Sequence, residues 1–279
     1  MPEAELFTRL HFLYVSSIYI AVRVFIDCGT GYAVVPTLTG DQVREEIEKA
    51  GRFCLGGIMG DRAPAAVDYA GMEAACTVHQ GDMPPPDRIF SAVESVVSEE
   101  GLRNASVDRI AARIGMSKSS LYFYFKNKDD IFRRMLDREK EYVARIFSSP
   151  AGQSGGFADQ SYCCMVKTAT YTLNNPALLT FFNWLRYHNI ALAVPKPDPE
   201  LTREMFSFIL KARDRGELAG GDDDLLHAAA LLHVAAFRIV MDLHGSGRSR
   251  DTIMLHLRNF HKLCLGGIFA KDLFPRESL

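Results

Sequence analysis

Five residues between positions 118 and 124 carry side chains that suit contacts with nucleic acid. They are Lys118, Ser119, Ser120, Tyr122 and Tyr124. An ammonium group binds phosphate, while hydroxyl groups form hydrogen bonds with both phosphate oxygens and base edges. If the segment is a short helix, Leu121 and Phe125 anchor its other side. The pattern therefore predicts a helix that presents five polar or aromatic side chains outward, in a form that suits the major groove of DNA.

Two preceding helices are expected to hold this short helix in place. Apolar residues recur at helical spacing over residues 88–100, and Gly101 ends that segment. Ser106 is a good N-cap for a second helix over residues 107–114, whose buried stripe is Val107, Ile110, Ala111 and Ile114. Gly115 permits a sharp turn, and Ser117 caps the third helix, residues 118–125. Together these segments predict a helix-turn-helix.

The succession SVDRIAARIGMSKSSLYFYFKNKDDIF, residues 106–132, resembles the TetR (tetracycline repressor) family of bacterial regulators. The resemblance covers some 45 residues and implies a DNA-binding domain followed by a helical ligand-binding and dimerisation domain. It implies that Ser117, Lys118, Ser119 and Ser120 approach bases or phosphates. It also implies that Tyr122, Tyr124 and Lys128 hold the DNA backbone, and Ser106 completes this set of candidate DNA-binding residues. Ser119 departs from the family pattern, in which many members have glycine.

The charge of this segment favours an anionic partner. Residues 103–134 hold eight basic and three acidic residues, a local charge of +5, within a chain whose formal net charge is −2. Phosphate contacts supply much of the affinity of DNA-binding proteins. The alternative is that these charges only solvate a surface, but the completeness of the motif favours DNA binding.

A repeated sequence links the two ends of the chain. The pentapeptide CLGGI occupies residues 54–58 and recurs at residues 264–268, and residues 21–27 (AVRVFID) align with residues 236–242 (AFRIVMD). In both copies a long apolar helix, a glycine-containing loop and a second amphipathic helix are expected. A chance similarity of two apolar helices is the alternative. We interpret the repeat as a duplication.

The TetR resemblance implies what was duplicated, because the last two helices of that family form a four-helix dimer interface. Residues 222–268 take that place, so residues 1–60 resemble the tail of a second module. Two arrangements remain open for self-association. The two copies face each other within one chain as a pseudo-dimer, or the second copies form a homodimer with the first copies packed outside.

These patterns predict an all-α fold with four parts. They are a helix pair (1–60), a linker (61–86), the helix-turn-helix domain (87–132) and a helical effector-binding and dimerisation domain (133–279). Within the last part, Tyr162, Phe181, Trp184, Tyr187 and His188 are candidate ligand-binding residues. Such an aromatic stripe is more often core, but it would suit an apolar ligand with one polar group.

The expected function is a ligand-responsive transcriptional regulator. It is expected to be a repressor that binds a double-stranded DNA operator and is released by a small apolar or amphipathic molecule. The alternative is an interaction protein whose extra helix pair blocks normal dimerisation and weakens operator binding. No catalytic motif is present, the histidine spacing does not favour a metal site, and no cofactor is expected.

Cysteine usage and hydropathy indicate a cytoplasmic protein. The six cysteines include no Cys-x-x-Cys pair, and the two adjacent ones, Cys163 and Cys164, are expected to be buried and reduced. The apolar run at residues 10–26 contains Arg23, Ser16 and Ser17 and is shorter than a clean membrane span. We expect a buried helix there and no membrane partner.

Overall fold

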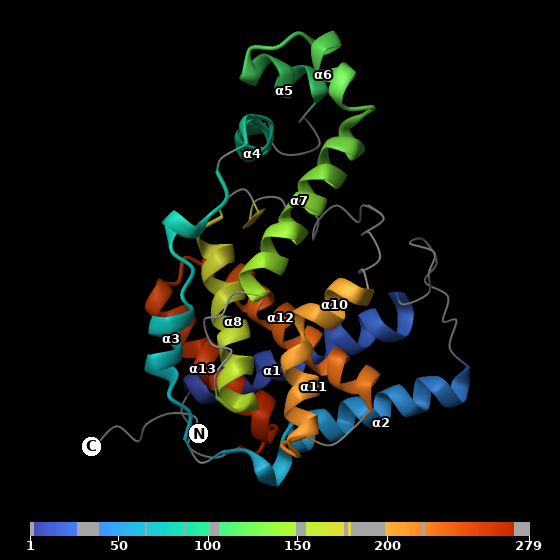
Figure 1. The fold of residues 1–279 in the computed structure, drawn as a ribbon, viewed down its shortest axis with the longest axis vertical. Coiled ribbons are helices and arrows are strands. Elements are labelled where there is room, and N and C mark those ends of the chain that lie inside the picture. Colours follow the sequence, from blue (N-terminus) through green and yellow to red (C-terminus); the bar gives the residue numbers. More distant parts are fainter. Residues whose placement is uncertain are drawn as a thin grey trace. The chain divides into compact units, whose positions relative to one another are not determined.

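The structure is a computed structural model that describes residues 3–26, 39–64, 66–85, 87–100, 106–148, 155–175, 178–179, 199–218 and 221–270. These residues form helices and connecting segments without a strand, which confirms the predicted all-α class. Figure 1 labels the helices along the chain. Their bounds are α1 Glu3–Ile26, α2 Gly40–Gly56, η1 Gly60–Arg62, α3 Tyr69–Cys76, η2 Gln80–Asp82, α4 Arg88–Glu100, α5 Val107–Ile114, α6 Lys118–Tyr124, α7 Lys128–Ser148, α8 Phe157–Leu173, α10 Pro199–Met205, α11 Ser207–Asp214, α12 Asp222–Gly245 and α13 Arg250–Gly266.

Contacts divide the chain into two compact units. The first comprises Met1–Thr77, Ser148–Ala169 and Lys196–Leu279, and the second comprises Val78–Phe147 and Thr170–Pro195. This division does not coincide with the sequence-based boundary at residue 132. Helix α7 groups with the helix-turn-helix because its Ile131 belongs to the core of that domain. Farther along α7, Tyr142, Val143 and Ile146 pack against Val78, Tyr171 and Leu178 of the same unit.

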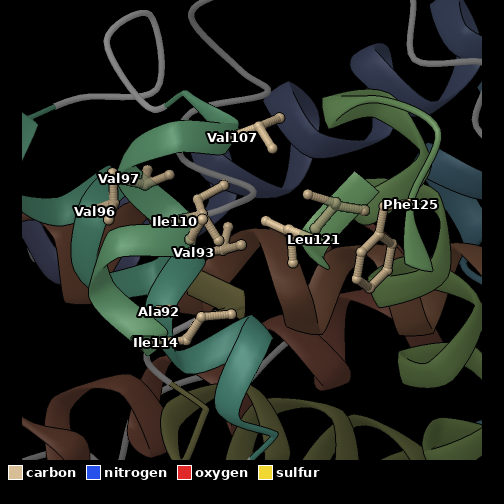
Figure 2. Close-up of a cluster of buried hydrophobic side chains, with 11 residues drawn as sticks. Ala92, Val93, Val96, Val97, Val107, Ile110, Ile114, Leu121 and Phe125 are labelled. Carbon is tan, nitrogen blue, oxygen red and sulfur yellow. The ribbon is translucent and has the colours of Figure 1, made fainter. Parts of the chain in front are cut away.

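The core of the helix-turn-helix lies in the second unit. Figure 2 shows side chains from α4, α5 and α6 that point toward one another. The buried members of this cluster are Ala92, Val93, Val96, Val97, Val107, Ile110, Ala111, Ile114, Leu121, Phe125 and Ile131. They are the apolar stripes expected from the sequence, with Ile131 of α7 added. Their burial fixes the short helix α6 on a rigid base.

In the first unit, α3 is joined to α8 and α13 by covalent and polar contacts. Glu73 of α3 accepts hydrogen bonds from Arg258 of α13 and from the Tyr162 hydroxyl of α8. Burial would raise the pKa of Glu73, but these hydrogen bonds outweigh burial and lower it. A disulfide joins Cys76 and Cys163, so the expectation that Cys163 is reduced was wrong. Sequence spacing could not reveal this pair because its members are 87 positions apart.

The two copies of the repeat form helix pairs of equal length. Helices α1 and α12 each have 24 residues, and α2 and α13 each have 17. Thr39 caps α2 by accepting a hydrogen bond from the Gln42 amide, and Ser249 caps α13 through the Thr252 amide. The caps lie 210 positions apart, as do the two CLGGI segments, so the second helices correspond residue by residue.

The two helix pairs pack against each other within the chain, and their final turns make reciprocal hydrogen bonds. The amide of Ile58 donates to the carbonyl of Cys264, and the amide of Ile268 donates to the carbonyl of Cys54, both over 2.8 Å. Two glycines permit this close crossing. A Cβ atom on Gly57 would lie 2.3 Å from the Leu265 carbonyl oxygen, and one on Gly267 would lie 2.1 Å from that of Leu55. Both glycines also have φ angles in the left-handed region, at 69° and 78°.

Helix α1 is only half buried, which differs from the expectation of a buried helix. Phe12 and Val15 are in the core, together with His11, whereas Leu6, Leu10 and Leu13 are exposed. Over residues 3–17, where the side chains of α1 are described, one face of the helix is buried and the other is exposed. Among the described residues, no helix has the length and hydropathy needed to cross a membrane.

Candidate nucleic-acid interface

Two serines and a glycine set the direction of α6. The Ser106 hydroxyl accepts a hydrogen bond from the Arg109 amide and so begins α5. Gly115 ends α5 at a φ of 70°, a conformation that residues with a Cβ rarely adopt. The Ser117 hydroxyl then accepts from the Ser120 amide at 3.0 Å and begins α6. Each predicted cap is confirmed, and the turn between the two helices takes three residues.

The outward face of α6 is the predicted one. Lys118, Ser119, Ser120, Tyr122 and Tyr124 are all exposed, whereas Leu121 is buried. Phe125, which was expected inside the helix, is its C-cap residue and is also buried. The remaining candidate, Lys128, opens α7, and its side chain lies outside the described part of the chain. The structure thus presents an amine, hydroxyl groups and aromatic rings from one short helix.

Two polar side chains of this face already have partners within the protein. Lys118 forms a 2.8 Å ion pair with Asp108 of α5, and this hydrogen bond raises the pKa of Lys118. The hydroxyl groups of Ser117 and Ser120 lie 2.8 Å apart. An exposed ion pair is worth little in water, so phosphate can compete for Lys118.

Phe123 is a residue of this face that sequence reasoning missed. Its side chain is 85% exposed, and its ring makes an edge contact with Tyr124 at a centroid distance of 5.4 Å. The signal was available in the sequence, because position 123 lies between two outward tyrosines and off the side anchored by Leu121.

The predicted positive charge is partly neutralised by acids that precede it in the chain. Arg113 bonds Glu99 and Ser95 of α4, and Arg109 lies 3.5 Å from Glu100. The hydrogen bond from Arg113 lowers the pKa of Glu99 to about 2, so this carboxylate is charged at neutral pH. The charge count over residues 103–134 left these two acids out, and it overstates the field around α5.

Arg138 is a second residue that the sequence analysis missed. Its guanidinium lies 3.1 Å from the Asp87 carboxylate and donates to the Pro85 carbonyl at 2.8 Å. It also lies over the ring of Phe90, 5.4 Å from the centroid. Asp87 in turn accepts hydrogen bonds from the first amides of α4. Arg138 therefore fixes the start of α4 against α7, on which the helix-turn-helix is carried.

Of the five candidate ligand-binding residues, only Tyr162 lies within the described part of the chain. Tyr162 is fully buried, donates its hydroxyl to Glu73, and makes an edge contact with the Tyr69 ring at 4.7 Å. These contacts place Tyr162 in the core of the first unit. Phe181, Trp184, Tyr187 and His188 lie outside the described residues.

The geometry of α4 to α6 is that of a helix-turn-helix DNA-binding domain. Residues 89–135 match the model of the bacterial regulatory proteins of the tetR family. This segment of the chain belongs to the TetR family.

Curated relatives share part of the chain. An uncharacterized HTH-type transcriptional regulator of Haemophilus influenzae is 28% identical over 95 residues, which is 34% of this chain and 50% of the relative. An HTH-type transcriptional repressor of Streptomyces coeruleorubidus is 36% identical over 70 residues, which is 25% of this chain and 24% of the relative. The chain therefore spans about half the length of the first and about a quarter of the second.

The helical architecture also resembles a solved structure. The fatty acid degradation regulator FadR from Bacillus halodurans superposes with a TM-score of 0.53 at 19% identity, covering 68% of this chain and 100% of that one. At this level of identity the likeness concerns the fold.

Proposed function

We propose that the protein is a ligand-responsive DNA-binding transcriptional regulator, and specifically a repressor, in which α6 enters the major groove. The exposed face of α6 carries this proposal, because it combines an amine, hydroxyl groups and tyrosines on a rigid base in a segment of the TetR family. Ser106 and Ser117 also contribute to DNA binding in this proposal, because they lie at the N-termini of α5 and α6 and helix N-termini favour phosphate.

Contacts to phosphate and contacts to bases should respond differently to mutation. Tyr122→Phe and Lys128→Ala remove groups proposed to bind the backbone, so both should weaken binding to every sequence. Lys118→Ala and Ser120→Ala should change which sequences are preferred. Fluorescence anisotropy with DNA fragments selected by the purified protein, measured across salt concentrations, tests both expectations. Unchanged affinity in all four variants would exclude α6 as the recognition helix.

The same titration has a control in the chain. Lys211 is an exposed lysine of α11 in the first unit, and Lys211→Ala should leave affinity and salt dependence unaltered. An equal loss with this variant would mean that net charge, rather than the α6 face, governs binding.

The effector in this proposal is a small apolar or amphipathic molecule bound near Phe181, Trp184, Tyr187 and His188. Two polar contacts of the second unit connect α8 to α7, and α7 to the start of α4, and provide a route from the effector to the DNA-binding helices. Tyr171 of α8 bonds Glu139 of α7, and the neighbouring Arg138 is paired with Asp87 at the start of α4. A ligand that shifts α8 would thereby favour a different setting of the DNA-binding helices.

Trp184 provides a direct test of this effector site because it is the only tryptophan in the chain. A ligand that releases DNA should alter its emission and lower DNA affinity by about 1–3 kcal/mol of coupling free energy. If such ligands leave the emission unaltered and Trp184→Phe retains the full response, the effector binds elsewhere.

We also propose that residues 1–60 replace a partner subunit by pairing with residues 222–268 of the same chain. The reciprocal hydrogen bonds of the CLGGI segments support this pseudo-dimer. Cross-linking in a mixture of isotopically light and heavy chains tests it. Links between the two helix pairs should join light to light or heavy to heavy. Mixed links would instead indicate pairing between chains.

The alternative function is an interaction protein in which the extra helix pair occupies the dimer surface and operator binding is weak. The same reciprocal contacts favour it, since one DNA-binding domain remains per chain. Solution mass combined with titration of operator-length DNA separates the two, because the alternative predicts a monomer without sequence-selective binding.

A further inference from the structure

Phe123 lies on the side of α6 that is farthest from the core of the helix-turn-helix. Each residue of an α-helix turns the chain by about 100°, so Phe123 is about 200° around the helix from Leu121, which is fully buried. Ser119, one turn earlier, lies on the same line and is also exposed. Ser119 and Phe123 therefore form the outermost line of α6, where a surface that receives this helix comes closest.

The surroundings of Phe123 on α6 suit nucleic acid better than an apolar protein partner. The centre of a protein interface gathers apolar side chains and is depleted of charge. The exposed side chains of α6 one turn before Phe123 are Ser119 and Ser120, and Lys118 precedes them. On the other side, the ring of Tyr124 makes an edge contact with Phe123 at a centroid distance of 5.4 Å. Phe123 is thus a single hydrocarbon ring among hydroxyl groups and an amine.

The chemistry of a phenyl ring limits what Phe123 can contact in the major groove. The ring has no hydrogen-bond donor or acceptor, so it cannot pair with the polar edges that every base presents there. The C5-methyl group of thymine is the one apolar group on these edges, and phenylalanine is among the side chains that contact it. The contact with Tyr124 restricts the ring, which lowers the conformational entropy lost on binding.

We propose that Phe123 determines part of the DNA sequence preference by contacting the C5-methyl group of a thymine. The inference rests on the proposed function, in which α6 enters the major groove. It adds an apolar contact to the polar contacts proposed for Lys118 and Ser120. It also predicts a preference for an A·T pair that depends on the methyl group alone, without a hydrogen bond from the protein.

Removal of single methyl groups from the DNA tests this contact. Fragments selected by the purified full chain define the preferred sequence, and each thymidine is then replaced in turn by deoxyuridine, which pairs with adenine in the same way. Fluorescence anisotropy should show binding weakened about fourfold at one or more positions, as expected for one buried carbon group. At those positions Phe123→Ala should bind the thymidine and deoxyuridine fragments equally. Phe123→Leu, which keeps an apolar side chain, should retain part of the difference.

The matched control is Phe269→Ala, which removes an equally apolar ring that is 74% exposed in the first unit. It should leave both the affinity and the thymidine-to-deoxyuridine ratio unaltered. Far-UV circular dichroism and thermal unfolding should be the same for all variants, since the Phe123 ring is 85% exposed and contributes little to the fold.

Two results with a chain that binds DNA selectively would overturn the inference alone. One is a wild-type chain for which no deoxyuridine substitution matters. The other is a thymidine preference that Phe123→Ala retains, including the case in which this variant weakens binding to every fragment equally, as loss of a sugar contact would. A wild-type chain without selective DNA binding would instead overturn the proposed function and this inference with it.

Discussion

Helices α2 and α13 have the same length, equivalent caps and the same final sequence, yet their outer sides meet different surroundings. Where the two helices cross, Gly57 and Gly267 make equivalent contacts. On the outer side, Leu265 is buried and Leu55 is exposed. The comparison shows that a repeated sequence can preserve one interface while the other face depends on the rest of the chain. Differences in stability between matched residues should therefore report the surroundings of each copy.

The largest loss of stability is expected at the crossing of α2 and α13, where the two copies of the repeat are alike. Gly57→Ala and Gly267→Ala each place a Cβ against a backbone carbonyl and strain a positive φ, so each should lower the free energy of unfolding by about 3 kcal/mol or more. Gly60→Ala is the control. Gly60 has a φ of 55° but open space around its Cβ position, so its variant should lose only about 1 kcal/mol. Denaturant unfolding measures all three, and equal losses would contradict the close crossing.

The second prediction tests where the copies differ. Leu265→Ala should lower the free energy of unfolding by about 3 kcal/mol because a buried leucine leaves a cavity. Leu55→Ala should cost less than about 1 kcal/mol, since its side chain is already half in water. The measurement is denaturant unfolding at a concentration where chain association is constant. Equal losses would show that the outer sides are equivalent in solution.

The third prediction concerns the covalent link between α3 and α8, which lies outside both copies of the repeat. The Cys76–Cys163 disulfide closes a loop that contains the whole helix-turn-helix domain. Cys76→Ser should lower the free energy of unfolding by about 2–4 kcal/mol, chiefly because loss of the disulfide raises the conformational entropy of the unfolded chain. Cys54→Ser, which removes a free cysteine, is the matched control and should cost less. A reducing agent that destabilises the wild-type chain but not Cys76→Ser would support the assignment, and equal sensitivity of both would contradict it.

The sequence predicted the helix-turn-helix well because its signals are local. Ser106 and Ser117 each cap the helix that follows within a few residues, and Gly115 marks the turn. The spacing of apolar residues also identified the buried face of α5. Such signals depend on backbone geometry over one helical turn, so they can be recognised in the sequence without knowledge of tertiary contacts.

Contacts between distant positions were not predictable in the same way. Cys76 and Cys163 belong to no spacing motif, and Arg138 meets Asp87 only because α7 returns past the start of α4. The repeat predicted which residues are equivalent, but it could not reveal that Leu55 and Leu265 differ in burial. Burial depends on neighbouring elements that the two copies do not share.

The smallest effect should come from two buried histidines that α13 has and α2 lacks. His256 contacts Thr8 and His11 of α1, and His261 contacts Tyr69 and Ser161. Burial lowers the pKa of both histidines from 6.5 to about 3, with His11 adding to the effect at His256. The equivalent positions on α2 are Glu46 and Gly51, so this titration belongs to one copy only.

The sign of the pH dependence follows from these depressed pKa values. Below pH 6.5 the unfolded chain binds protons at both histidines, while the folded chain does not, so the free energy of unfolding falls as the pH falls from 6.5 toward 3. Each histidine should contribute a loss of about 1 kcal/mol between pH 7 and 5.5. Replacing either with glutamine should reduce the pH dependence by that amount, whereas glutamine at the exposed His244 should leave it unaltered. Denaturant unfolding at pH 7 and 5.5 decides the matter, and an unchanged difference in the His256→Gln, His261→Gln double variant would place the acid sensitivity outside α13.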